Sequence, residues 1–160
     1  MAGYNENRMA TEIERKFLVT GEGWRQASPT RICQGYLNRD ADRTVRVRIA
    51  GERGYLTIKG RAKNLARPEF EYEIPLADAE QLLKLCEGPI LEKHRHVLEH
   101  AGSRWEVDEF HGDNEGLVVA EIELESEDQT FERPAWLHTE VTHDARYLNS
   151  NLSARPYRTW

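Results

Sequence analysis

The sequence predicts an α+β fold that is predominantly β, in which eight strands pair mainly in antiparallel fashion. First, apolar and polar residues alternate in eight separate segments, as they do in strands with one buried face. Second, short turns, several of them containing glycine, join most of these segments, and short turns favour antiparallel pairing. Third, one segment in the middle of the chain, Ala77–Cys86, changes to a helical period with good helix formers and an apolar stripe.

The first half of the chain contains five of the predicted strands. In the first of them, Glu12, Glu14 and Lys16 point to one side, while the apolar residues of the strand point to the other. The following strands repeat this alternation, and Gly51–Gly54 predicts a hairpin turn between the third and the fourth. The five segments are Thr11–Val19, Arg31–Asn38, Thr44–Ala50, Tyr55–Gly60 and Glu69–Ile74.

The second half of the chain begins with the predicted helix, which we expect Gly88-Pro89 to end. Three more strands follow, and two short helices are expected near the C-terminus, the first with Ser126 as its N-cap. Eight strands are enough to close a barrel. Alternation alone fits both an open sheet with its charged face in water and a barrel with that face inside. The strands are Ile90–Leu98, Arg104–Phe110 and Leu117–Glu125, and the helices lie in Ser126–Arg133 and Thr142–Leu152.

The length of 160 residues predicts one domain. We place it at residues 10–152, after an N-terminal extension at 1–9 that we expect to be disordered and before a C-terminal tail at 153–160. The net charge of −6 argues against a general nucleic-acid binder. No apolar run reaches the length of a membrane span, no signal peptide is recognisable, and Cys33 and Cys86 lack metal-ligand spacing. These features predict a reduced cytoplasmic protein without nucleic-acid or membrane partners.

Charges on the polar faces of the predicted strands are segregated by sign. Converging Arg and Lys side chains would hold several phosphates. Converging carboxylates repel each other unless a hard cation such as Mg²⁺ or Mn²⁺ lies between them. We therefore predict a polyphosphate ligand that carries divalent metal. The acidic faces contain Glu12 and Glu14, then Glu69, Glu71 and Glu73, then Glu106 and Asp108, and finally Glu121, Glu123 and Glu125; the basic faces contain Arg46 and Arg48, Lys59 with Arg61, and Lys93 with Arg95.

These segments resemble the CYTH / triphosphate tunnel metalloenzyme family. The first strand carries the signature Glu12-x-Glu14-x-Lys16, and further matching segments follow in order over nearly the whole chain, from Thr11 to about Leu152. The chain is most similar to short bacterial members that hydrolyse inorganic triphosphate. The resemblance implies an eight-stranded antiparallel barrel that forms a tunnel, a few covering helices, substrate inside the tunnel, and a requirement for Mg²⁺ or Mn²⁺. The matching segments are RICQGYL (31–37), VRVRI (45–49), LTIKG (56–60), EFEYEI (69–74), EKHRH (92–96), EVDEF (106–110), AEIELE (120–125) and DARYLNSNL (144–152).

The resemblance also implies roles for individual residues. Tyr36 matches a tyrosine close to the substrate, and Arg146 matches a basic residue near the tunnel mouth. As a mechanistic hypothesis, Glu73 or Glu123 positions water in line with the terminal phosphorus. Leu148 stands where some relatives carry lysine, which leaves the preferred substrate length open. The expected metal ligands are Glu12, Glu14, Asp108, Glu121 and Glu123; the expected phosphate-binding residues are Lys16, Arg46, Arg48, Lys59, Lys93, Arg95 and Arg146; and the expected catalytic residues are Lys16, Tyr36, Glu73 and Glu123.

Three other functions stay open: an adenylate cyclase, a thiamine or nucleoside triphosphatase, and a non-catalytic polyphosphate-binding module. The first two need room for an organic group, and the sequence contains no obvious motif for adenine reading or thiazole stacking. The third would keep the basic residues without productive metal, and the four glutamates of the expected metal site speak against it. The expected partner is a small-molecule triphosphate, and a homodimer is an assembly that the sequence leaves open.

Overall fold

A computed structural model describes residues 11–160, so the expected extension at residues 1–9 lies outside the described residues. Strands dominate the fold, and helices are few and short. The strands are β1 (Thr11–Val19), β2 (Thr30–Asn38), β3 (Arg43–Ala50), β4 (Arg53–Gly60), β5 (Ala66–Ile74), β6 (Glu87–His100), β7 (Ser103–Phe110), β8 (Val118–Glu123) and β9 (Leu137–Glu140). The helices are α1 (Leu76–Leu83) and α2 (Asn149–Ala154), with 3₁₀ turns η1 (Gly112–Asn114), η2 (Ala145–Tyr147) and η3 (Tyr157–Thr159).

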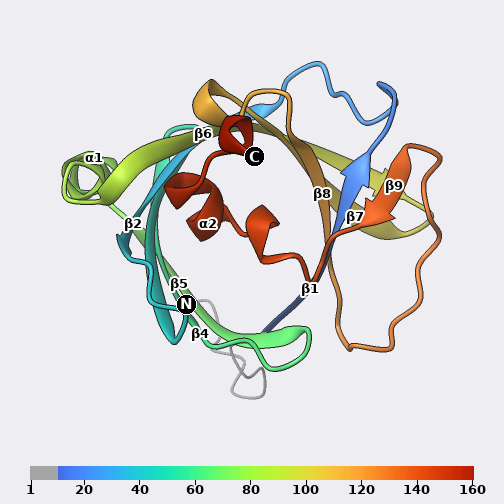
Figure 1. Cartoon of the computed structure of the whole chain (residues 1–160), viewed down its shortest axis with the longest axis horizontal. Helices are drawn as coiled ribbons and strands as arrows, with labels where there is room; N and C mark the ends of the chain where they lie inside the picture. The colour runs from blue at the N-terminus through green and yellow to red at the C-terminus, as the bar shows by residue number, and fades with distance from the viewer. Residues whose placement is uncertain (1–10) are drawn as a thin grey trace, which may run out of the picture.

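Eight of the strands close into a ring in the order β5-β4-β3-β2-β6-β7-β8-β1 (Figure 1). The ring closes because Thr11–Ile13 of β1 pair with Ala66–Pro68 of β5, and every pairing in it is antiparallel. The ninth strand, β9, lies outside the ring and pairs with the C-terminal part of β1. The structure therefore confirms the eight-stranded antiparallel barrel and adds a short strand that alternation did not predict.

The largest hydrophobic cluster lies outside the ring, on the outer faces of β1, β7 and β8. Phe17, Trp105 and Ile122 are at most 1% exposed there. Trp24 of the β1–β2 loop and Trp136 of the segment before β9 pack against the same cluster. Loops therefore cover this side of the barrel, where covering helices were expected.

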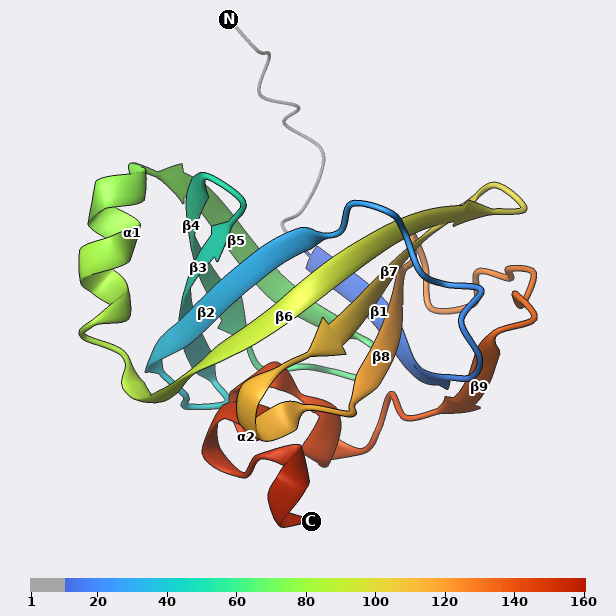
Figure 2. The same cartoon turned by 90° about the horizontal axis from the view of Figure 1, so that it is seen from above.

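Helix α1 covers the opposite side of the barrel, over β3 and β4 (Figures 1 and 2). The contact is close because β4 carries Gly54. A Cβ built at Gly54 would lie 2.6 Å from the Cβ of Ala79, a distance that real side chains do not tolerate. The glycine thus sets how near the helix comes to the sheet.

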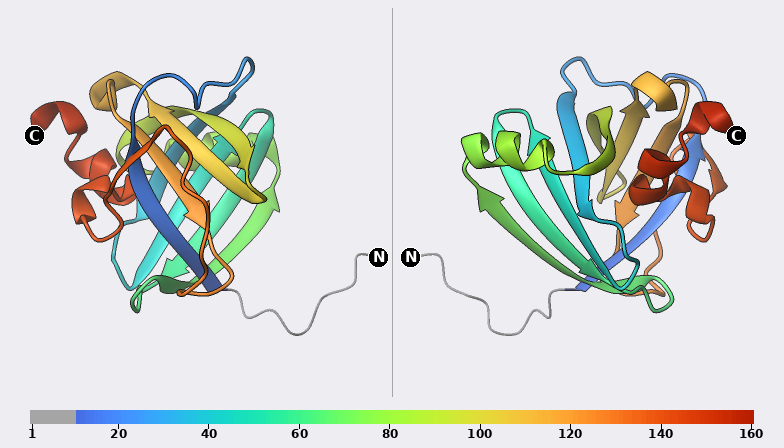
Figure 3. Two further views of the ribbon diagram at one scale, coloured as in Figure 1. Left: turned by 90° about the vertical axis from the view of Figure 1, so that its right-hand side faces the viewer. Right: turned by 60° about the vertical axis from the view of Figure 1, so that its left-hand side comes forward.

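The C-terminal segment closes one end of the barrel (Figures 1 and 3). Tyr147 and Leu152 are buried in a second hydrophobic cluster, which also contains Leu91 of β6 and Phe110 of β7. Residues 153–160, expected as a tail, also pack on the domain, since Ser153 is buried and Trp160 stacks edge-on against Tyr147. This segment gives the tunnel one closed end.

Two local predictions differ from the structure. The strand β6 begins at Glu87, so Gly88-Pro89 lies inside the strand, whereas α1 already ends at Leu83. No helix forms within residues 126–133; a single turn follows β8, and Phe131 then packs edge-on against Trp105. Burial of this aromatic ring outweighs the local N-cap signal. None of the helices among residues 11–160 is both long and apolar enough to cross a membrane.

Candidate functional site

A cavity of about 1160 Å³ runs through the barrel and is lined by side chains from all eight strands of the ring. Each strand turns its charged face inward. The apolar outer faces of β1, β7 and β8 are buried against loops, whereas Ile58 of β4 and Phe70 and Tyr72 of β5 are exposed on the outside of the barrel. The chain therefore places its segregated charges around one enclosed space. The expected site residues that line it are Glu12, Glu14, Lys16, Tyr36, Arg46, Arg48, Lys59, Lys93, Arg95, Glu121 and Glu123.

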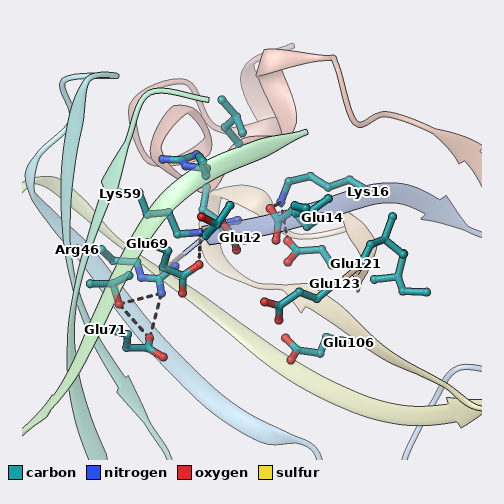
Figure 4. Close-up of a pocket in the computed structure, with 18 of the residues that line it drawn as sticks. Glu12, Glu14, Lys16, Arg46, Lys59, Glu69, Glu71, Glu106, Glu121 and Glu123 are labelled. Atoms are coloured by element: carbon teal, nitrogen blue, oxygen red, sulfur yellow. Dashed lines mark hydrogen bonds and ion pairs between the residues drawn. The ribbon is translucent and has the colours of Figure 1, made fainter. Parts of the chain in front are cut away.

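The acidic wall of the tunnel is formed by β1, β7 and β8. Glu14 and Glu123 are direct cross-strand partners, and Glu121 stands opposite Glu106 of β7 (Figure 4). Like charges placed directly opposite each other destabilise a sheet. Burial, together with Glu12, Glu106 and Glu14, raises the pKa of Glu123 above its usual value. This wall therefore favours a bound cation.

Two lysines partly neutralise the negative charge of the acidic wall. Lys16 Nζ lies 2.6 Å from Glu121 Oε1 and 3.2 Å from Glu14 Oε1, and Lys59 Nζ lies 2.6 Å from Glu12 Oε2. Burial opposes the charge of Lys16, but Glu121 and Glu14 raise its pKa above the ordinary value.

The oxygen donors of this wall suit a hard divalent cation. In residues 11–160, however, no three of these carboxylates already surround one point.

The basic wall is formed mainly by β3 and β6. Arg48 Nε donates a hydrogen bond to Gln34 Oε1 at 2.9 Å, and no carboxylate of the described residues lies within ion-pair distance of its guanidinium. Burial, with the neighbouring charges of Arg46 and Arg95, lowers the pKa of Arg48 to about 9. A partly buried arginine without a counter-ion favours an anion.

Asp108 lies behind this wall and does not line the tunnel. Its Oδ2 accepts a hydrogen bond from Lys93 Nζ at 2.6 Å, and Arg95 Nε and Nη2 donate to its two oxygens at 2.8 Å. Burial opposes its ionisation, but Arg95 and Lys93 hold the pKa of the carboxyl well below its usual range. Lys93 is 0% exposed, and burial lowers its pKa to about 7. Asp108 thus positions two cations, in contrast to the expected role as a metal ligand.

This geometry has counterparts among known proteins. The family model described as CYTH domain matches residues 10–157, which is most of the chain. The chain belongs to the CYTH domain family. Two curated relatives are named inorganic triphosphatase: one from Acetivibrio thermocellus is 49% identical over 154 residues, covering 95% of this chain and 99% of the relative. The other, from Nitrosomonas europaea, is 39% identical over 149 residues, covering 89% and 97%.

A solved structure, that of the inorganic triphosphatase NE1496, superposes on this CYTH domain with a TM-score of 0.65. The two chains are 35% identical, and the match covers 89% of this chain and 97% of the other. The barrel and its tunnel are therefore the family's fold.

Two expected site residues of this CYTH domain do not reach the tunnel. Glu73 lies near the end of β5 with its side chain 54% exposed, 3.4 Å from Arg53 Nε. Arg146 lies in η2, where it pairs with Asp144 and stacks over Trp160 at 4.9 Å. Both residues lie outside the tunnel lining.

His94 and His96 alternate with Lys93 and Arg95 along β6 and do not line the tunnel. His96 is 3% exposed and packs edge-on against Trp24 at 5.0 Å, while His94 Nδ1 lies 2.6 Å from His111 Nε2. These residues belong to the outer packing of β6.

Sequence reasoning missed several polar residues of the tunnel. Thr57 Oγ1 donates to Glu71 Oε1 at 2.9 Å and accepts from Arg46 Nη2 at 3.2 Å, and Gln34 binds Arg48. Both share a strand face with charged or aromatic tunnel residues, so alternation could have found them. Asn149 belongs to α2 and lines the tunnel, so the alternation of the strands could not predict it. Glu69, Glu71, Glu106 and Glu125 of the predicted acidic faces also line the tunnel, although no site role was expected for them. The polar lining residues that were not singled out include Thr11, Thr44, Arg67, Ser103, Arg104, Gln129 and Ser150.

Proposed function

We propose that this CYTH domain is a divalent-metal-dependent hydrolase of inorganic triphosphate. One observation carries the proposal: Glu123 and Arg48 line the same tunnel, and among residues 11–160 neither has an oppositely charged side chain within ion-pair distance. A triphosphate that carries a divalent cation supplies both. The two relatives named inorganic triphosphatase support this substrate.

The metal would be held by glutamates of the acidic wall. Glu14 and Glu123 are the primary candidates because they already face each other, with Glu12 and Glu121 adjacent to them. When bound there, Mg²⁺ or Mn²⁺ would neutralise charge on the phosphate oxygens. Asp108 is not needed in this set, since both its oxygens are engaged by Lys93 and Arg95.

The phosphate groups would be bound by the cations of the basic wall. Arg46 and Arg48 present guanidinium groups that suit bidentate contacts with phosphate oxygens. Lys16 and Lys59 become available when metal takes over their glutamates. Tyr36, which is 4% exposed and pairs across the sheet with Arg46, lies beside these cations. Phosphoryl transfer mainly requires alignment and charge stabilisation, which such a set of side chains provides.

Glu123 is the best candidate to orient the attacking water. It lines the tunnel and is the direct cross-strand partner of Glu14. Glu73, the other carboxylate expected in this role, lies outside the lining. The free thiols of Cys33 and Cys86 support a reducing compartment such as the cytoplasm. A homodimer stays a hypothesis that light scattering tests.

A phosphate-release assay tests the proposal and separates it from the alternatives. Triphosphate, ATP and thiamine triphosphate are compared with Mg²⁺, with Mn²⁺ and with EDTA. We expect release from triphosphate that requires metal and exceeds release from the two organic substrates. Faster release from ATP or thiamine triphosphate would reassign the substrate. If the protein bound triphosphate tightly but released no phosphate in the presence of Mg²⁺ or Mn²⁺, it would be a non-catalytic binding module.

A further inference from the structure

Two neutral amide side chains link the C-terminal helix to the basic wall of the tunnel. Asn149, the first residue of α2, lines the tunnel, and its Oδ1 accepts hydrogen bonds from Lys93 Nζ at 3.0 Å and from Gln34 Nε2 at 3.3 Å. Gln34 is 0% exposed, and its Oε1 accepts the bond from Arg48 Nε at 2.9 Å. A continuous hydrogen-bonded chain therefore joins Arg48 to Lys93 through the two amides.

The cations at both ends fix which atom each amide presents. Arginine and lysine can only donate hydrogen bonds. Gln34 must therefore turn its oxygen toward Arg48, and Asn149 must turn its oxygen toward Lys93. The remaining nitrogen of Gln34 then meets the oxygen of Asn149, so that each bond has a donor and an acceptor. Reversing either amide would place two donors against each other. The chain has one favourable arrangement, and it fixes Arg48 relative to Lys93.

Helix α2 is held in place independently of Asn149. Leu152 is 0% exposed in the hydrophobic cluster with Leu91 and Phe110, and Ser153 Oγ donates to the carbonyl oxygen of Pro89 at 3.1 Å. These contacts attach the helix to β6 and β7 one turn beyond Asn149. The helix is therefore a fixed support that presents Asn149 to the cations.

We propose that Asn149 and Gln34 are positioning residues that hold Lys93 and Arg48 in place for the phosphate groups of the substrate. Amides suit this task because they accept hydrogen bonds without cancelling positive charge. A carboxylate in either place would form an ion pair with the cation and compete with phosphate. This inference rests on the function proposed above and adds two uncharged residues to the phosphate-binding machinery.

Steady-state kinetics of variants at residue 149 test the proposal. Asn149→Ala leaves Lys93 Nζ and Gln34 Nε2 without this acceptor. We expect KM for triphosphate to rise about fivefold, the equivalent of about 1 kcal/mol for one hydrogen bond, while kcat changes less than twofold. Asn149→Asp, which is nearly isosteric, should raise KM more than the alanine variant does. The double variant Gln34→Ala/Asn149→Ala should raise KM by less than the product of the single effects, because the residues act as one chain.

The matched control is Asn151→Ala, the same substitution on the exposed side of α2, whose side chain contacts only the carbonyl of Ala145. Its KM should equal that of the wild type. Thermal melts check that each variant folds. Wild-type KM in both residue-149 variants, a loss confined to kcat, or fully independent effects in the double variant would overturn the proposal.

Failure of the proposed function itself would appear differently, as absence of phosphate release from triphosphate by the wild type. Calorimetric titration of triphosphate into the same variants then decides the inference. About fivefold weaker binding by Asn149→Ala supports it, and unchanged binding overturns it.

Discussion

The two walls of the tunnel differ in the charge that is left unbalanced. The acidic wall has excess negative charge, and the basic wall has excess positive charge. On the acidic wall, Glu14 faces Glu123 across two strands, and Glu123 has no hydrogen-bond or ion-pair partner among residues 11–160. On the basic wall, Arg48 has an amide as its partner and no carboxylate within ion-pair distance in the described part of the chain. The two residues line one cavity without neutralising each other. The difference indicates a ligand that brings both a cation and a polyanion.

The two walls also differ in how firmly they are held. Asp108 and the amides fix the main cations of the basic wall from behind. The acidic wall is held from the front by Lys16 and Lys59, which themselves point into the tunnel. We therefore expect the basic wall to keep its arrangement when ligand binds and the acidic wall to rearrange.

Removing one charge from the acidic wall should have the largest effect. We expect Glu14→Gln to lower kcat for triphosphate by at least about 100-fold, because the variant loses a carboxylate proposed to hold the metal that supplies positive charge at the reacting centre. Phosphate release in Mg²⁺ measures the effect, and circular dichroism checks the fold. Glu80→Gln, on the exposed face of α1, is the matched control and should keep wild-type activity. Near wild-type turnover by Glu14→Gln would break the assignment of this wall.

Removing a cation from the basic wall should act mainly on binding. We expect Arg48→Ala to raise KM by about 10- to 100-fold, since hydrogen bonds to charged groups contribute about 1.5–3 kcal/mol. Arg48→Lys should recover part of the affinity, because lysine restores the charge but not the bidentate geometry. Arg53→Ala, an exposed arginine paired with Glu73 outside the tunnel, is the control. An unchanged KM for Arg48→Ala would show that phosphate binds elsewhere.

The basic wall should also respond to pH. Burial lowers the pKa of Lys93 to about 7, so its ammonium is charged below that pH and increasingly neutral above it. KM for triphosphate should therefore rise, by less than about tenfold, between pH 6 and pH 8.5. Lys93→Arg, which stays charged, should flatten this rise relative to the wild type. Parallel profiles for both proteins would exclude Lys93 as the cause.

The smallest expected effect is on the melting temperature of the metal-free protein when one charge of the acidic wall is removed. The pKa of Glu123 is raised in the folded state, so ionised Glu123 destabilises the fold above its folded pKa, and this cost vanishes as pH falls and the group is protonated. Glu123→Gln should therefore melt at a slightly higher temperature than the wild type at pH 8 in EDTA, with the difference narrowing toward pH 5. Mg²⁺ should then stabilise the wild type more than the variant. A lower melting temperature for the variant at pH 8 would contradict this account.

Much of the tunnel could be predicted from the sequence because strands encode their faces directly. Alternation in β1 placed Glu12, Glu14 and Lys16 on one side, and all three line the cavity. Alternation could not decide that β1 pairs with β5 to close the ring, since closure depends on contacts between distant residues. The family resemblance supplied that part of the prediction.

The sequence predictions differ from the structure where tertiary contacts, rather than the local sequence pattern, set the position of a residue. Glu73 continues the alternation of β5 but lies beyond the cavity, because the strand leaves the lining near its end. Asn149 carries no periodic signal, and its position depends on the burial of Leu152, which lies one turn further along α2. The capping residue predicted a helix in the segment 126–133, but this segment forms no helix and its Phe131 packs against Trp105.

The central claim is that one ligand completes both walls. The most direct measurement is a crystal structure of the protein with Mn²⁺ and a non-hydrolysable imido analogue of triphosphate, with the metal located by anomalous scattering. We expect the metal at ligand distance from Glu123 and a phosphate group hydrogen-bonded to Arg48. Metal and phosphate bound outside the barrel, with both residues left without ligand, would contradict the account.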